Sequence, residues 1–134
     1  MIQSDAIMPY TRRKMLRRTL LVLGLVLAAA TARAADFVPG TEDVPLMPGL
    51  APVEGASVVF DKPEGRIVEA AARGKLDRGK VRDFYGATLP QLGWSAASRD
   101  AWRREGEVLR LDFRGSDGNL TVGFTLSPQQ EPRP

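Results

Sequence analysis

The chain contains no histidine and no cysteine among its 134 residues. The absence of histidine excludes Ser-His and Cys-His nucleophile pairs, imidazole metal ligands and the commonest general base. The absence of cysteine excludes disulfides, thiolate metal sites and a lipid anchor at a lipobox. An enzyme built on this sequence would depend on carboxylates, lysine or serine alone, and we expect neither a metal nor a cofactor.

A long apolar run is also missing. The longest, Leu20 to Ala30, has 11 residues, whereas a membrane-spanning helix needs about 20. Basic residues precede it, and small residues follow it up to Ala32-Arg33-Ala34, which is the arrangement of a secretory signal peptide. We therefore predict a signal peptide over residues 1–34, cleavage between Ala34 and Ala35, and export to the bacterial periplasm with no stable membrane span afterwards.

The export route stays open. The stretch TRRKMLR resembles the twin-arginine export motif, with Arg12 and Arg13 as the pair and Met15 where that family usually has an aromatic residue. Translation could start at Met1, Met8 or Met15, and a start at Met15 would delete the motif and leave an ordinary Sec signal.

Removal of the signal peptide reverses the sign of the net charge. The whole chain has a formal charge of +3, but residues 35–134 keep 13 basic and 15 acidic residues, hence −2. The basic field that attracts nucleic acid is therefore absent, and we expect the partner to be another envelope protein. A mature chain of this length forms one domain with a modest core.

Residues 35–56 form a Pro- and Gly-rich arm. The run VPLMPGLAP cannot hold a helix or a central strand. We expect an extended segment that is partly mobile or docks through its apolar residues Val44, Leu46, Met47 and Leu50. The tail, residues 128–134, has a composition typical of disorder.

Residues 57–127 are predicted to form an α+β domain of order ββαβββ, with one helix packed on one face of an antiparallel sheet. A hairpin spans 57–61 and 66–72, although the alanine run in its second strand also suits a helix. The helix spans 77–92, with Asp77 as N-cap and Gly93 as the left-handed terminator. Three strands follow, with turns at Glu105-Gly106 and Gly115 to Asn119.

The stretch VRDFYGATLPQLGW, residues 81–94, is interpreted as scaffold. Its apolar residues fall on one helical stripe, and Pro90 predicts a bend near the helix end. The stripe consists of Val81, Phe84, Tyr85, Leu89 and Leu92. With the strands that follow, it resembles a small bacterial envelope domain in which a helix ending in L-x-x-x-GW packs on an antiparallel sheet. A more distant likeness is to the helix-grip domains of outer-membrane assembly lipoproteins, which bind other proteins but carry a lipobox cysteine.

Two motifs are weak hints of chemistry. GKLDRGKV, residues 74–81, fits the GxxxxGK pattern of a phosphate loop with Lys80, but Val81 stands where the magnesium-binding Ser or Thr belongs. Glu105 and Glu107 straddle a tight turn that is open to water, whereas a carboxylate that acts as a general acid needs a buried position. We interpret both as turn chemistry.

The uncovered sheet face is the remaining functional candidate. Arginine and tryptophan are the residues in which interfaces concentrate binding energy. The candidate binding residues are Trp102, Arg103, Arg104, Arg110 and Arg114, set against a plain solvated face as the default interpretation, and for Trp102 the sequence favours ordinary packing in the core or the hairpin. The sequence thus predicts an exported, monomeric or weakly oligomeric, non-catalytic binding protein. Two alternatives are an accessory subunit that docks on a larger envelope enzyme and a small carboxylate-dependent hydrolase.

The exported protein is expected to begin at Ala35. Intact-mass analysis of periplasmic material should give the mass of residues 35–134, because the Ala32-Arg33-Ala34 site ends the signal. Full-length protein in the membrane fraction would contradict this prediction.

Overall fold

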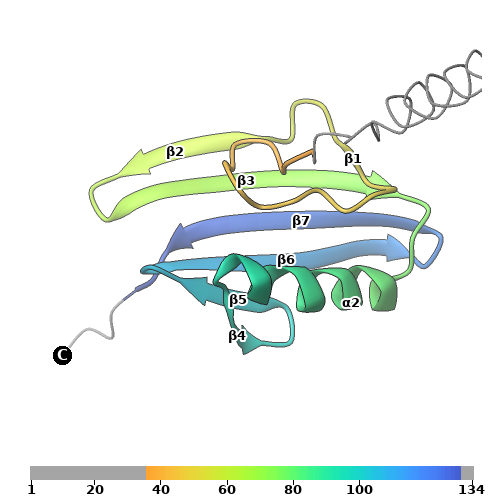
Figure 1. The fold of residues 1–134 in the computed structure, drawn as a ribbon. Helices are drawn as coiled ribbons and strands as arrows, with labels where there is room; N and C mark the ends of the chain where they lie inside the picture. The colour runs from red at the N-terminus through yellow and green to blue at the C-terminus, as the bar shows by residue number, and fades with distance from the viewer. Residues whose placement is uncertain (1–35, 131–134) are drawn as a thin grey trace, which may run out of the picture. The chain divides into compact units, whose positions relative to one another are not determined.

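A computed structural model describes residues 36–130. The predicted signal peptide, with Arg12, Arg13 and the cleavage site Ala34-Ala35, lies outside the described residues, as do residues 131–134 of the tail. The described part is an α+β fold with one α-helix and a seven-stranded antiparallel sheet (Figure 1). The predicted fold class is therefore confirmed at this level.

The sheet runs in the order β1-β3-β7-β6-β5-β4, and β2 also pairs with β3. The strands are β1 (Ala51–Pro52), β2 (Val58–Lys62), β3 (Gly65–Gly74), β4 (Ser95–Ser98), β5 (Ala101–Arg104), β6 (Glu107–Ser116) and β7 (Asn119–Pro128). Strands β3, β6 and β7 have ten residues each and form the centre of the sheet. The alternation of apolar and polar residues along them sets which side chains face inward.

Along the chain, the structure has two more strands than the predicted order ββαβββ. The arm contributes β1, and four strands follow the helix instead of three. The extra strand arises because the chain reverses at Arg99-Asp100 to form the β4–β5 hairpin. Asp100 sits in this turn and pairs with Arg82 on the helix, so a contact distant in sequence fixes the reversal. Strand β7 also continues one residue into the predicted tail, to Pro128.

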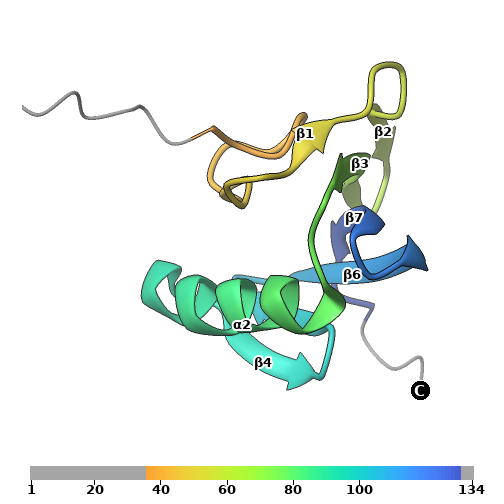
Figure 2. The same ribbon diagram turned by 90° about the vertical axis from the view of Figure 1, so that its right-hand side faces the viewer.

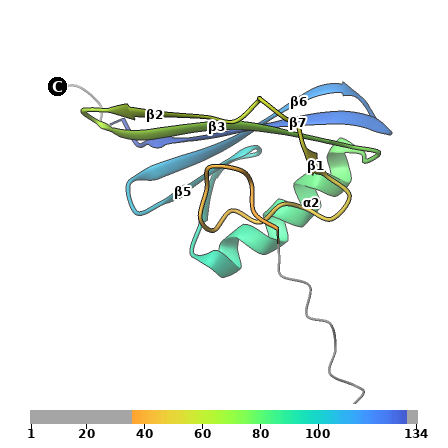
Figure 3. The same cartoon turned by 90° about the horizontal axis from the view of Figure 1, so that it is seen from above.

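The core lies on one side of the sheet, where α2 (Arg78–Thr88) and the arm both pack (Figures 2 and 3). Apolar residues from β3, β6 and β7 meet the buried helix residues Val81, Tyr85 and Leu89 there. The arm adds Val38, Val44 and Leu50, all buried. Among residues 36–56 the docked arrangement of the arm is therefore the one observed.

The first turn of α2 is capped by a residue from another part of the chain. Asp77 occupies the predicted N-cap position with an extended backbone, but its side chain makes no capping hydrogen bond. The Arg78 N–H instead donates to Asp117 Oδ1 at 3.1 Å, from the turn between β6 and β7. The cap was missed in the sequence because such a partner has no local spacing signal.

The α-helix ends at Thr88, before the predicted end at Leu92, and the chain continues as a 3₁₀ turn, η1 (Leu89–Leu92), which contains Pro90. Gly93 follows with a φ of 88°, the left-handed conformation that glycine adopts without strain. The prediction that Leu92 belongs to the buried stripe is wrong, since Leu92 is 42% exposed. Phe84 is only partly buried. After the reversal at Gly93, Trp94 enters the core in place of Leu92.

Tyr85 joins the helix, the arm and the sheet. Its hydroxyl donates to the Pro45 carbonyl oxygen at 2.9 Å and accepts from the Met47 N–H at 3.2 Å. Its ring meets the Phe124 ring of β7 edge-on, with centroids 5.7 Å apart. Burial raises the pKa of the Tyr85 hydroxyl from 10.0 to about 12, so the group stays protonated and keeps donating to a higher pH than an exposed tyrosine would.

Replacing Tyr85 with Phe should loosen the arm. The change leaves the Pro45 carbonyl and the Met47 N–H without their partner, which costs about 1 to 3 kcal/mol in urea unfolding. Hydrogen exchange at the Met47 amide should become faster. Leu89→Ala, which empties a fully buried site away from these hydrogen bonds, should cost about 2 to 5 kcal/mol. Unchanged exchange at Met47 in Tyr85→Phe would contradict the assignment.

The Arg82–Asp100 pair should make stability sensitive to acid. Arg82 donates two hydrogen bonds to the carboxylate, at 2.8 and 2.9 Å, and lowers the pKa of Asp100 from 3.8. A lowered folded-state pKa means that the contribution is present above the unfolded-state pKa and is lost as pH falls through the folded-state pKa. In Asp100→Asn, the free energy of unfolding should fall less steeply between about pH 5 and pH 2 than in the wild type. Asp83→Asn, an exposed change on the same helix, is the control, and equal flattening there would refute the role of Asp100.

Candidate binding face

The sheet has a second face, which no described segment covers (Figures 2 and 3). We call it the open face. Strand alternation and register assign its residues. They include Val58, Phe60 and Lys62 of β2, Ile67, Glu69, Ala71 and Arg73 of β3, Thr121, Gly123, Thr125 and Ser127 of β7, Val108, Arg110, Asp112 and Arg114 of β6, and Ala101 and Arg103 of β5.

The structure divides the five predicted binding residues between the two faces. Arg103, Arg110 and Arg114 are exposed on the open face. Trp102 faces the other way, because side chains alternate along β5, and it is 3% exposed within the core. Its alternative interpretation as core packing therefore holds, and Trp102 is not available to a partner on the open face.

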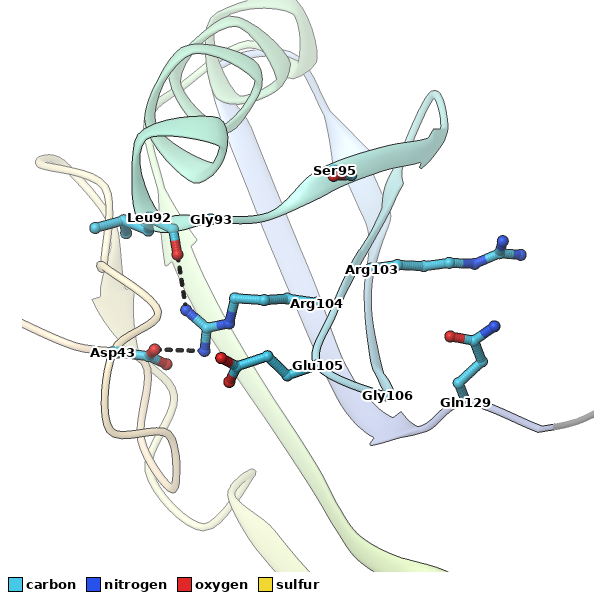
Figure 4. Close-up of a pocket in the computed structure, with 9 residues that line it drawn as sticks. All are labelled: Asp43, Leu92, Gly93, Ser95, Arg103, Arg104, Glu105, Gly106 and Gln129. Carbon is cyan, nitrogen blue, oxygen red and sulfur yellow. Dashed lines mark hydrogen bonds and ion pairs between the residues drawn. The ribbon is translucent and has the colours of Figure 1, made fainter.

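Arg104 also lies on the covered side, where it ties the arm to the sheet. Its guanidinium stacks over the Trp94 ring, 4.3 Å from the centroid, and forms an ion pair with Asp43. A further N–H donates to the Leu92 carbonyl at 3.0 Å (Figure 4). Neighbouring Arg103 points in the opposite direction in the same view. Arg104 borders a hollow of about 530 Å³, but its guanidinium is already bound to other residues of this chain. We therefore assign Arg104 a structural role.

The largest hollow on the open face lies toward the β2–β3 hairpin, with a volume of about 1000 Å³. Lys62, Arg103 and Arg110 bring positive charge to it and Glu64 brings one negative charge, while Ile67 and the largely buried Val108 form an apolar base. Arg103 stands opposite Val108 on the neighbouring strand, and Arg110 stands opposite Thr125. We call this site the basic hollow. Sequence reasoning missed Lys62 and Ile67. They come near the two arginines only through the pairing of β2 with β3, of β3 with β7 and of β7 with β6.

The opposite end of the open face is more nearly neutral. Arg114 forms an exposed ion pair with Asp112 at 3.5 Å. The Asp112 carboxylate lies directly across Gly123 of β7, where a Cβ atom would collide with it. Within residues 36–130, by contrast, neither Arg103 nor Arg110 has an ion-pair partner. Two of the three open-face arginines without an ion-pair partner among residues 36–130 therefore lie at the basic hollow, and the third is Arg73.

The charge of the open face differs from that of the described chain. Residues 36–130 contain 12 basic and 14 acidic residues, so they carry a formal charge of −2. The open face has five basic residues, Lys62, Arg73, Arg103, Arg110 and Arg114, against the two acids Glu69 and Asp112. Such local concentration of one sign steers oppositely charged partners to the face even when the whole molecule is acidic.

The phosphate-loop pattern has a packing explanation. A Cβ atom on Gly74 would collide with the Gly49 carbonyl oxygen, so the glycine lets the arm approach β3 closely. Lys80 is exposed on the first turns of α2. Gly74 therefore serves arm docking, whereas a Cβ atom on Gly79 would meet nothing within 4 Å.

The described residues also contain no group of three acidic side chains placed to hold a metal ion. Within the same range, no helix has the length and apolar character needed to cross a membrane. Glu105 and Glu107 lie at the β5–β6 turn, as expected, with Glu105 exposed.

No protein-family model, curated protein or solved structure matches this chain. The resemblance to small envelope domains with a helix ending in L-x-x-x-GW therefore stays a prediction.

Proposed function

We propose that this is a non-catalytic binding protein of the bacterial periplasm, whose basic hollow binds an acidic segment of another envelope protein. The observation that carries the proposal is the pair Arg103 and Arg110, exposed above an apolar base and without ion-pair partners in residues 36–130.

The chemistry of the basic hollow favours a protein segment over a small polar solute. Guanidinium groups bind carboxylates through two parallel hydrogen bonds, which gives both affinity and orientation. The partly exposed Ile67 offers apolar surface that a peptide side chain can cover. A segment with spaced acidic residues and an apolar residue between them therefore fits the basic hollow.

A second candidate role is that of an accessory subunit on a larger envelope enzyme. The arm is a poor docking element for this role, because Val38, Val44 and Leu50 are already buried in the core. An accessory subunit would therefore use the same open face, so both roles make the same demand on Arg103 and Arg110.

A carboxylate-dependent hydrolase has less support. Such an enzyme needs two carboxylates converging on a concave site, one of them with a raised pKa. Asp100 is the described carboxylate with a shifted pKa, and the shift is downward, because Arg82 holds the ionised form. Its partner is structural, so this carboxylate is not set up as a general acid.

Charge reversal at the basic hollow should weaken binding of an acidic peptide. We expect Arg103→Glu/Arg110→Glu to lower the affinity of residues 35–134 for a decaglutamate peptide about thirtyfold, which is the loss of one binding hot spot. Calorimetry measures the affinity, and amide shifts in ¹⁵N spectra locate the peptide. The melting temperature should stay near the wild-type value, because both side chains are exposed.

The matched control is Lys75→Glu/Lys80→Glu, which changes the net charge equally at exposed positions in and just before α2. This variant should lose only the small part of the affinity that long-range attraction supplies, and this part shrinks in about 0.2 M salt. Equal losses in both double variants, or peptide-induced shifts centred on α2, would refute the basic hollow as the binding site.

A further inference from the structure

The two edges of the sheet are built differently. At one edge, β4 has four residues, Ser and Ala only, and its pairing with β5 is interrupted by an irregularity between Ala96 and Ser98. Shortness and bulges are devices that prevent edge strands from pairing with other chains. At the other edge, β2 has five residues in unbroken register with β3.

Strand β2 exposes apolar side chains on both of its faces. Val58, Val59 and Phe60 are 41%, 41% and 45% exposed, and they account for three of the five large exposed apolar residues among those described. Lys62 and Pro63, which discourage edge pairing, stand only at the end of the strand. Figures 1 and 3 show no described segment alongside the outer edge of β2.

The hairpin fixes which backbone groups of β2 point outward. A two-residue turn, Pro63-Glu64, joins β2 to β3, and Lys62 pairs with Gly65. The residues flanking such a turn form a hydrogen-bonded pair, and bonded pairs alternate along an antiparallel ladder. Val59 and Asp61 therefore direct their N–H and C=O groups away from β3, toward whatever lies next to the edge.

From this arrangement we infer that β2 pairs antiparallel with β2 of a second copy of this chain, centred on Val59. In that register Val59 lies opposite the partner's Val59, and Val58 lies opposite the partner's Phe60. All three apolar residues then meet apolar residues, and the outward N–H and C=O groups of the two Val59 residues bond to each other. This inference is independent of the proposed function.

The alternative registers are less favourable. A register centred on Asp61 places two carboxylates opposite each other, which destabilises a strand pair. A register centred on Phe60 places Val59 opposite the partner's Asp61 and Val58 opposite the partner's Lys62, so apolar surface meets charge. The register centred on Val59 instead places Asp61 opposite the partner's Ser57, so that no like charges meet and no apolar residue faces a charge there.

The dimer has two further properties. Its two-fold axis is perpendicular to the sheet, so both open faces lie on the same side of one continuous sheet. Because only three residues of each β2, Val58 to Phe60, pair with β2 of the partner in this register, the interface is small, and small interfaces are weak and transient. We therefore expect a dimer that forms only at high protein concentration.

Single cysteines provide a test of the register, because the chain has none of its own. Val59→Cys should form a disulfide-linked dimer under mild oxidation, since directly paired residues lie about 5.5 Å apart between Cα atoms, within disulfide reach. Asp61→Cys is the matched control on the same strand. In the proposed register its two sulfurs are offset by four residues, about 13 Å, so it should crosslink at least tenfold more slowly. Ser98→Cys, on the opposite edge, should be equally slow.

Sedimentation equilibrium between about 10 μM and 1 mM tests the dimer without crosslinking. Wild-type residues 35–134 should show a rising dimer fraction, and Val59→Lys, a change at a side chain that is 41% exposed, should stay monomeric while remaining folded. A monomeric wild type at 1 mM, a dimer that survives Val59→Lys, or crosslinking of Asp61→Cys as fast as Val59→Cys would each overturn the inference. Decaglutamate binding to Val59→Lys should match the wild type, which separates this result from the proposed function.

Discussion

The hydroxyl of Tyr85 is the contact on which the arrangement of the molecule depends. It bonds to the backbone at Pro45 and Met47, while the ring packs on Phe124, so one side chain fixes the arm, the helix and the sheet relative to one another. The prolines keep the arm from joining a regular ladder for most of its length. Its backbone polar groups therefore need a side-chain partner inside the molecule, and the raised pKa keeps this partner protonated.

The docked arm determines the character of the two sheet faces. Helix and arm together cover one face, where buried residues such as Leu109, Val122 and Phe124 gather. Both layers lie on the same side, so strict alternation sends Arg103 of β5 and the arginines of β6 to the other face. Arg104 is one position further along β5 than Arg103, so its side chain points to the covered side. There it contacts the arm instead of standing on the surface.

The same packing leaves the apolar side chains of β2 exposed at the edge of the sheet. A strand paired on one side only, with a helix and an arm placed over the middle of the sheet, keeps apolar side chains in contact with water. Burial in the core therefore explains the apolar residues of β3 and β7, but it does not explain those of β2. A partner along this edge would give these residues the burial that the fold itself does not provide.

Local patterns in the sequence determined the elements that depend on neighbouring residues. The period of residues 81–89, the glycine at 93 and the alternation along β6 and β7 follow from helix and strand geometry, so the α+β class was predictable. Tertiary structure alone decided the cap from Asp117, the reversal held by Arg82 and Asp100, and the burial of Trp102. Each of these contacts joins two segments that are far apart in sequence, so it forms and stabilises the protein only when the chain has folded. A residue's type limits which partners suit it, but only packing decides which face it occupies and whether those partners are inside the molecule or outside it.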